Sequence, residues 1–350
     1  MSSGAASPVA HLVGAGSALP GAPVDNGTLA GLIGASASWI DDFTGTRTRH
    51  FATDLKTGAA THALVDLCHE AAEAAIADAG IEPGEVGFVV LSTATPDHLM
   101  PATVNLVADR LGIGHVPTYQ LQSGCVGAIQ ALDLACRILR DPETDGSCAT
   151  GLVIGADVCN KHLLLDRDFA RVPPRELVNY MLFGDGAGAA VVSREPWGHR
   201  TAIRRVLNRF VGLGQSPGQV IEWFGLADRL DERPAAQEDY KAIEENVPRL
   251  AEEILCELAD DLAWDLDRVE YVLPPQLSGR MTELIVDRIA LPAREVSCVA
   301  ATGNNGNALP FLQLGRLLPQ LRDGERALCA AVESSKWLKG GLALEKTAIG

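Results

Sequence analysis

The stretch Gln122-Ser-Gly-Cys-Val-Gly127 is the part of the sequence best suited to covalent chemistry. It follows a short apolar run, and the apolar positions from Val126 to Leu139 keep helical spacing, so Cys125 is predicted at the start of a helix. Unpaired N–H groups and the helix dipole favour an anion there, which is expected to lower the thiol pKa. A thiolate attacks carbonyl carbons, and the N–H of Cys125 can donate to the oxyanion that forms. A buried structural thiol is the alternative, because free cysteines are commonly buried.

Composition excludes several classes of function. The chain has 350 residues, 47% of them hydrophobic, and a formal net charge of −16. An acidic surface repels nucleic acid and anionic membranes, so neither is an expected partner. The sequence has no run of 18 apolar residues, so a membrane span is not expected. Its first apolar stretch is not preceded by a basic region, so secretion is not expected either. The eight cysteines show no CxxC pair and no zinc-like spacing, which predicts reduced thiols in a cytoplasmic protein without a metal site.

Alternating helices and apolar strands predict an α/β protein, and the pattern repeats. The segment from Ala77 to Leu91, the end of a helix and then an apolar strand, matches the segment from Ala259 to Leu273. The helix that follows Cys125 overlays a helix that follows Asn304 at a nearly equal offset. The chain is therefore predicted to be a duplicated α/β unit, with halves at 1–195 and 196–350. The loops carrying Cys125 and Asn304 would face each other at their junction.

Several motifs carry a resemblance to a known family, and they are spread over nearly the whole chain. They are VGAGSALPG at 13–21, Trp39-Ile40, TPDHLMP at 95–101, SGCVGAIQAL at 123–132, LFGDGAGAAVV at 182–192 and TGNNGNA at 302–308. With the duplication, they make the chain resemble the thiolase fold, and in particular the β-ketoacyl-acyl-carrier-protein synthase III family. The resemblance implies a thiolase-like, duplicated αβαβα fold of five layers. It also implies a homodimer in which residues 95–101 reach the partner's acyl pocket, placing Met100 there.

The resemblance also implies catalytic roles. In that family a cysteine takes an acyl group from a thioester, and a histidine and an asparagine assist decarboxylative condensation. By position, the nucleophile is Cys125 and the asparagine is Asn304. The histidine position of the family's strand-end motif is occupied by Pro275. Because a proline side chain neither donates nor accepts a hydrogen bond, Pro275 cannot stabilise an enolate or move a proton.

A second departure lies near the C-terminus. The family places a glycine-rich turn there, whose N–H completes the oxyanion hole, and this chain has Glu333-Ser-Ser-Lys336. A backbone N–H survives this change, but Glu333 brings a carboxylate close to the predicted site, where it can act as a base. A surface charge is the alternative, and the sequence leaves open whether Glu333 replaces the histidine.

The resemblance further implies a thioester substrate carried by coenzyme A or by the phosphopantetheine of an acyl carrier protein, and no cofactor. Trp39 would stack on coenzyme A, but Phe43 stands where the family usually has an arginine, whereas Arg280 keeps a basic position at the rim. The segment from Trp39 to His50 is otherwise interpreted as a solvated loop. The substrate-binding residues expected by position are Trp39, Phe43, Met100, Gln276, Arg280, Gly306, Ser334 and Ser335.

Three functions remain. The first is an acyltransferase that loads Cys125 from a carrier thioester and delivers the group, without decarboxylation, to a hydroxyl or amine of a small acceptor in specialised metabolism such as antibiotic biosynthesis. The second is a decarboxylative condensing enzyme, against which Pro275 argues. The third is a catalytically silent partner subunit, against which Cys125 and Asn304 argue. The sequence does not identify the acyl group, the acceptor or the pathway.

Overall fold

Ten strands form one continuous mixed sheet in the computed structural model, which describes residues 8–141, 148–162, 168–222 and 236–348. From one edge to the other the order is β12 (Arg294–Glu295), β11 (Tyr271–Leu273), β13 (Arg326–Glu333), β14 (Leu338–Lys346), β8 (Thr201–Phe210), β1 (Ala10–Ala18), β7 (Asp185–Ser193), β6 (Thr150–Val158), β4 (Phe88–Thr93) and β5 (Thr118–Gln122). The strands predicted before and after the Cys125 loop, β5 and β6, therefore lie on either side of β4.

The strand order is symmetric about the pair β1 and β8 in the middle. Reading outward, β7, β6, β4 and β5 follow β1 in one half, and β14, β13, β11 and β12 follow β8 in the other. In each half the second strand is antiparallel to both of its neighbours, and the outer three strands are parallel. This is the arrangement that the sequence repeat predicts. Residue 195 lies in the connection between β7 and β8.

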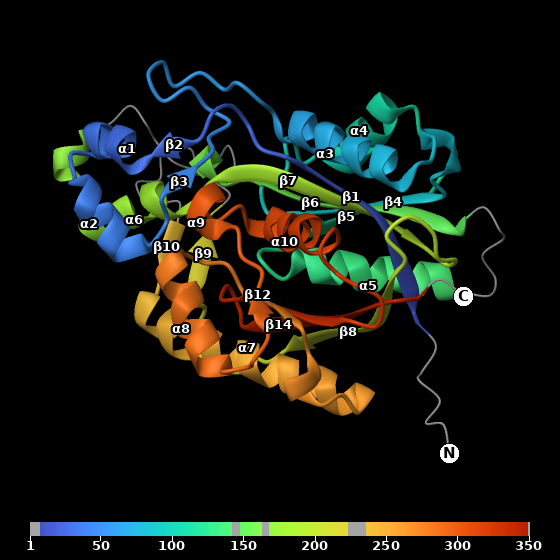
Figure 1. The fold of residues 1–350 in the computed structure, drawn as a ribbon. Helices are drawn as coiled ribbons and strands as arrows, with labels where there is room; N and C mark the ends of the chain where they lie inside the picture. The colour runs from blue at the N-terminus through green and yellow to red at the C-terminus, as the bar shows by residue number, and fades with distance from the viewer. Residues whose placement is uncertain (1–7, 142–147, 163–167, 223–235, 349–350) are drawn as a thin grey trace.

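The major helices form three layers that alternate with the two halves of the sheet (Figure 1). Helices α3 (Leu64–Ala79) and α4 (Thr103–Leu111) cover one outer face, and α7 (Tyr240–Leu262) and α8 (Gly279–Ile289) cover the other. Helices α5 (Gly127–Arg140) and α10 (Leu309–Leu317) lie between the halves and share one buried apolar cluster with strands of both. The predicted five-layered thiolase-like fold is confirmed.

Smaller elements gather at one end of the molecule (Figure 1). They are β2 (Val24–Asp25), α1 (Asn26–Ile33), α2 (Ala37–Thr44), β3 (Thr48–Arg49), α6 (Pro174–Leu182), β9 (Gln219–Ile221), β10 (Ala236–Glu238) and the short helix α9 (Val299–Thr302). The interpretation of residues 39–50 as a solvated loop is wrong. The Arg49 side chain is fully buried, because the carbonyls of Met181 and Thr46 and the side chain of Asn26 accept its N–H groups.

All eight cysteines are free thiols, and five of them are buried. Within the described ranges, no helix is both long enough and apolar enough to cross a membrane.

Strand β5 ends the sheet on the N-terminal side, so one of its two edges is left unpaired within the described structure. Exposed apolar side chains surround this edge, including Tyr119 on β5 and Leu99 and Met100 in the loop after β4, where Met100 is 87% exposed. An unpaired strand edge beside exposed apolar groups favours association with a second chain.

We therefore expect a homodimer, with a mass by light scattering of twice the 36.9 kDa of the chain. Tyr119→Glu is expected to shift the protein towards monomer, because it places charges at the paired edge. Phe210→Glu, at an exposed aromatic residue of β8 in the middle of the sheet, is the matched control and should leave the dimer intact. A monomeric natural protein at micromolar concentration would contradict this prediction.

Candidate active site

Cys125 lies in the turn between the edge strand β5 and helix α5. The N–H of Ser123 donates to the carbonyl of Thr93 at 3.4 Å, and the N–H of Gly127 donates to the carbonyl of Gly124 at 2.8 Å. Helix α5 begins at Gly127, so the cysteine precedes the first helical residue by two positions. The structure thus places Cys125 at a helix start, as its sequence context predicts.

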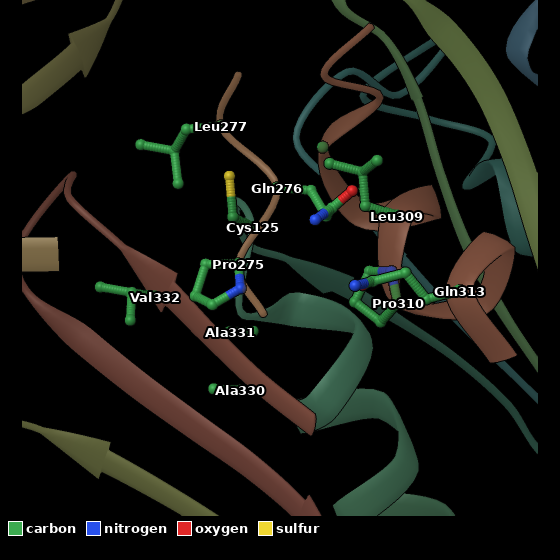
Figure 2. A pocket seen from close by; sticks show the side chains of 11 residues that line it. Cys125, Pro275, Gln276, Leu277, Leu309, Pro310, Gln313, Ala330, Ala331 and Val332 are labelled. Carbon is green, nitrogen blue, oxygen red and sulfur yellow. The ribbon is translucent and has the colours of Figure 1, made fainter. Parts of the chain in front are cut away.

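A cavity opens beside Cys125 (Figure 2). Apart from the cysteine, all of its lining residues belong to the C-terminal half of the chain. They are Pro275, Gln276, Leu277, Gly306, Leu309, Pro310, Gln313, Ala330, Ala331 and Val332. The walls are mostly apolar, and none of these lining residues is a histidine. The cavity therefore lies at the junction of the two halves, with a single thiol as its nucleophile.

The two glutamines of the cavity wall are committed to the backbone. The side-chain oxygen of Gln276 accepts the N–H groups of Cys298 and Val299, at 2.8 and 2.9 Å, where helix α9 begins. The amide nitrogen of Gln313 donates to the carbonyls of Pro274 and Val296, at 3.0 and 2.9 Å. Because a carbonyl oxygen has two lone pairs, the oxygen of Gln276 has no acceptor capacity left for a substrate. Gln276 shapes the cavity and holds its wall.

Glu333 is the last residue of β13 and is only 7% exposed, so it is not a surface charge. Its carboxylate accepts the hydroxyl of Ser123 and the N–H of Gly124, both at 3.1 Å, and the hydroxyl of Ser335. Two of these three donors belong to the Cys125 turn. The structure therefore brings Glu333 against the loop of the nucleophile, and Ser335, also expected at the site, contacts Glu333.

The expected lowering of the Cys125 pKa is wrong. Burial, and after it the negative charge of Glu333, raises the pKa of Cys125 to about 12. Loss of solvation and a neighbouring carboxylate both disfavour the thiolate, and here they outweigh the helix start. Cys125 is therefore a thiol at neutral pH, and its proton has to leave as the sulfur attacks.

Asn304 follows α9 on the opposite side of the junction. Its backbone is paired with the segment after α6, since its N–H donates to the carbonyl of Leu182 and its carbonyl accepts the N–H of Gly184. Its side-chain oxygen accepts the N–H of Gly306, a cavity residue, at 3.1 Å. This bond fixes the rotation of the amide, whose nitrogen donates to no residue of the described ranges. The amide N–H groups can therefore serve a substrate oxygen.

Three of the expected substrate-binding residues meet where helices α2 and α8 touch. The rings of Trp39 and Phe43 stack with centroids 5.5 Å apart, and they are 38% and 49% exposed. Arg280 donates from Nε to the carbonyl of Asp42 at 3.0 Å, which joins the two helices. These side chains form an exposed aromatic and basic surface, which suits contact with a partner molecule more than catalysis.

The other expected residues lie in different places. Gly306 lines the cavity, and the carbonyl of Ser334 accepts the N–H of Gly218 at 2.9 Å. Met100 is exposed at the edge of the sheet and lines no part of the cavity of its own chain. Its place in the pocket of a partner subunit stays a prediction.

Comparison with known proteins identifies the family. The family model of 3-oxoacyl-[acyl-carrier-protein] synthase III matches residues 119–207, from strand β5 through the Cys125 turn to β8. A β-ketoacyl-[acyl-carrier-protein] synthase III of Rhizorhabdus wittichii is 32% identical over 295 residues, which are 82% of this chain and 83% of the relative. This chain belongs to the ketosynthase III family.

Solved structures agree with this assignment. AbyA1, a tetronic acid condensing enzyme, is 54% identical with a TM-score of 0.92, covering 96% of this chain and 99% of its own. The 3-oxoacyl-(acyl carrier protein) synthase III of Pseudomonas aeruginosa PAO1 is 28% identical with a TM-score of 0.82, covering 97% and 99%. This protein is therefore an enzyme of the ketosynthase III family, a condensing or acyl-transferring enzyme.

Sequence reasoning missed two polar residues of this ketosynthase III site. Gln313 lies in the apolar run of α10, where a lone glutamine at a buried position is a signal that it binds backbone groups. Asn307, three residues after Asn304, contacts the Cys125 turn. It is part of the motif TGNNGNA, but sequence reasoning assigned it no role of its own. Its partner is distant in sequence, so nothing local marks its role.

We predict that Glu333→Gln speeds alkylation of Cys125 by iodoacetamide at pH 7.5, roughly threefold to tenfold, because loss of the carboxylate charge lowers the pKa of the thiol. In both proteins the rate should keep rising with pH into the alkaline range. Intact mass against time gives the rate, and peptide mapping confirms the site. Glu73→Gln, at an exposed glutamate of α3, is the control and should leave the rate unchanged. An unchanged or slower Glu333→Gln variant would count against this electrostatic coupling.

Proposed function

We propose that this protein is an acyltransferase that takes an acyl group from the thioester of an acyl carrier protein and passes it, without decarboxylation, to a hydroxyl group of a small acceptor. The observation that carries the proposal is the composition of the cavity. Its thiol is Cys125, the residue at the histidine position is Pro275, and the carboxylate of Glu333 is hydrogen-bonded to the Cys125 turn.

The first step loads the enzyme. The sulfur of Cys125 bonds to the acyl carbon, the bond from that carbon to the sulfur of the donor breaks, and the thiol proton leaves on the donor's pantetheine sulfur. The backbone N–H at Cys125 supplies a donor for the oxyanion of the tetrahedral intermediate. The donor thioester is consumed as a substrate in this scheme, which uses no cofactor.

The second step transfers the group to the acceptor. The acceptor oxygen attacks the acyl carbon, and the bond from carbon to the Cys125 sulfur breaks. Glu333 takes the hydroxyl proton and returns it to the departing thiolate, which regenerates the resting thiol. Asn304 orients the acceptor or the thioester carbonyl through its amide N–H groups.

Decarboxylation needs hydrogen-bond donors that this site supplies less well than those needed for acyl transfer to oxygen. It produces an enolate, whose negative oxygen needs donors, and loss of one such donor typically costs ~10²–10³ in rate. Pro275 supplies none, which leaves Asn304 alone. Acyl transfer to oxygen requires only the oxyanion N–H groups and one base.

The similarity to AbyA1 supports a hydroxyl rather than an amine as the acceptor group. A tetronic acid ring is a lactone, so its formation includes a bond between an oxygen and an acyl carbon. AbyA1 is 54% identical to this chain and covers 96% of it. On this similarity we propose that the present enzyme also forms a bond between an oxygen and an acyl carbon, and that it acts in specialised metabolism such as antibiotic biosynthesis.

We expect kcat/KM for an acyl group carried by the carrier protein to be at least tenfold higher than kcat/KM for the same acyl group carried by coenzyme A. Phe43 removes a charge-assisted contact to the nucleotide, of a kind worth ~1.5–3 kcal/mol, whereas Arg280 remains exposed for the acidic carrier. Arg280→Glu should weaken only the carrier reaction. Arg288→Glu, on the same helix, is the matched control. Equal kcat/KM values for the two donors would refute this preference.

Decarboxylative condensation is the second candidate, and the 32% identity to a β-ketoacyl synthase III favours it. Carbon dioxide release distinguishes the two functions, because only condensation with a malonyl thioester produces it.

We predict that enzyme loaded with an acetyl or another short straight-chain acyl group releases no carbon dioxide with malonyl-carrier protein, but forms esters with small alcohol acceptors. Cys125→Ala should give no acyl adduct by intact mass. Glu333→Gln should still load fully and transfer about 10²-fold more slowly, as expected for a lost general base. Pro275→His serves as the variant in which decarboxylation is sought. Steady carbon dioxide release coupled to a β-keto product by the natural protein would overturn the proposal and establish the condensing enzyme.

A further inference from the structure

Asn307 is fully buried on the short 3-10 turn Gly306–Ala308, between Asn304 and helix α10. Its side-chain nitrogen donates to the carbonyl of Ser123 and to the carboxylate of Asp157, each at 2.8 Å. Its side-chain oxygen accepts the hydroxyl of Ser92 at 2.8 Å, and its backbone N–H donates to Asp157 at 2.8 Å. One residue of the C-terminal half thus binds three segments of the N-terminal half.

Asn307 touches the nucleophile turn at both ends. Ser123, whose carbonyl it binds, comes two residues before Cys125. Gly127, which begins α5, comes two residues after it. A Cβ atom at Gly127 would lie 2.2 Å from the side-chain oxygen of Asn307 and 2.0 Å from the hydroxyl of Ser92, so only glycine fits. The amide therefore braces the turn from Ser123 to Gly127 on which the thiol is carried.

Asp157 holds Asn307 in turn. Its first carboxylate oxygen accepts the hydroxyls of Thr93 and Thr95 and the N–H of Ala94, and its second oxygen accepts both N–H groups of Asn307. Because Asp157 lies on β6, which is paired with a strand on each side, the amide of Asn307 is fixed to a rigid part of the sheet. Rotation of the amide would leave a buried carboxylate without one of its donors, which is costly.

We propose that Asn307 is a positioning residue for acyl transfer, which holds the Cys125 turn so that the sulfur and the backbone N–H of Cys125 meet the same thioester carbonyl. The inference rests on the proposed function, since it concerns the loading step. In that step the Cys125 sulfur bonds to the acyl carbon, and the donor sulfur departs with the thiol proton. A displacement of the turn by a few tenths of an ångström moves both groups, so the rate falls without loss of donor binding.

The experiment measures loading of Cys125 by a short-chain acyl-carrier thioester in single turnover, followed by intact mass. Asn307→Ala is expected to lower the rate constant at saturating donor at least tenfold, with the half-saturating donor concentration changed less than twofold. The final extent of acylation counts the active sites. A residue that only stabilises the fold would lower that extent and leave the rate constant of the remaining sites unchanged.

Asn305→Ala is the matched control. Asn305 is equally buried on the same loop and donates to the carbonyls of Asp185 and Thr302, but it does not contact the Cys125 turn. Its loss is expected to lower the melting temperature by a similar amount and to leave the loading rate constant within twofold. Equal slowing of the two variants would overturn the proposal.

Ser92→Ala tests the same contact with a smaller change, in case Asn307→Ala fails to fold. It removes the donor that holds the Asn307 oxygen but keeps the bond to Ser123, so a loss of two- to fivefold in the loading rate constant is expected. Where Asn307→Ala folds, the double variant should be no slower than Asn307→Ala alone, because both act through one amide. A Ser92→Ala rate constant equal to that of Asn305→Ala would overturn the proposal.

Failure of the natural protein to load any thioester would refute the proposed function. Normal loading by the natural protein and by Asn307→Ala alike would refute only the positioning role.

Discussion

The buried carboxylate of Asp157 is the constraint around which the two halves of this enzyme join. The side chain is 2% exposed, and no cation pairs with it within the described ranges. Burial raises the pKa of Asp157, against the opposing effect of the N–H donors of Asn307 and Ala94. A buried charge without a cation costs several kcal/mol unless hydrogen bonds replace its water. Here five do, and they come from both halves, so the carboxylate is satisfied only when the halves are closed in one register.

Closure in that register also sets the electrostatics of the nucleophile. It brings Glu333, at the end of β13, against the turn of Cys125, where its charge disfavours a thiolate. Loading replaces the neutral thiol with a neutral thioester, so the negative charge of Glu333 no longer opposes an ionisation at Cys125. In the proposed transfer, the same carboxylate accepts a proton from an incoming hydroxyl. Under the proposed function, the raised pKa of the resting thiol is a consequence of keeping a base beside it for the second step.

Local sequence patterns were sufficient to predict the elements, and the repeat was sufficient to predict their arrangement. Helical spacing placed α5 directly after Cys125, and the match between the segments ending at Leu91 and Leu273 anticipated the symmetric strand order. The chemical state of the site was beyond such patterns. The pKa of Cys125 depends on burial and on a carboxylate 208 positions along the chain, and neither has a local signature. The burial of Arg49 depends likewise on the carbonyl of Met181, in a helix distant along the chain.

The cavity has a mostly apolar wall, and the titratable and polar groups of the site lie at the Cys125 turn and beside it. Gln313 binds the carbonyl of Pro274, and Gln276 fixes the start of α9, so the segment that carries Pro275 is held in place with its polar atoms satisfied by the protein. That wall presents carbon to the cavity. The groups able to donate or accept protons, Cys125, Glu333 and Asn304, belong to other segments. Under the proposed function, an acceptor brings its nucleophilic oxygen to the side of the Cys125 turn and lays its carbon skeleton against the Pro275 wall. Such an arrangement favours attack on the acyl carbon of Cys125 and gives an enolate oxygen at the Pro275 wall no donor.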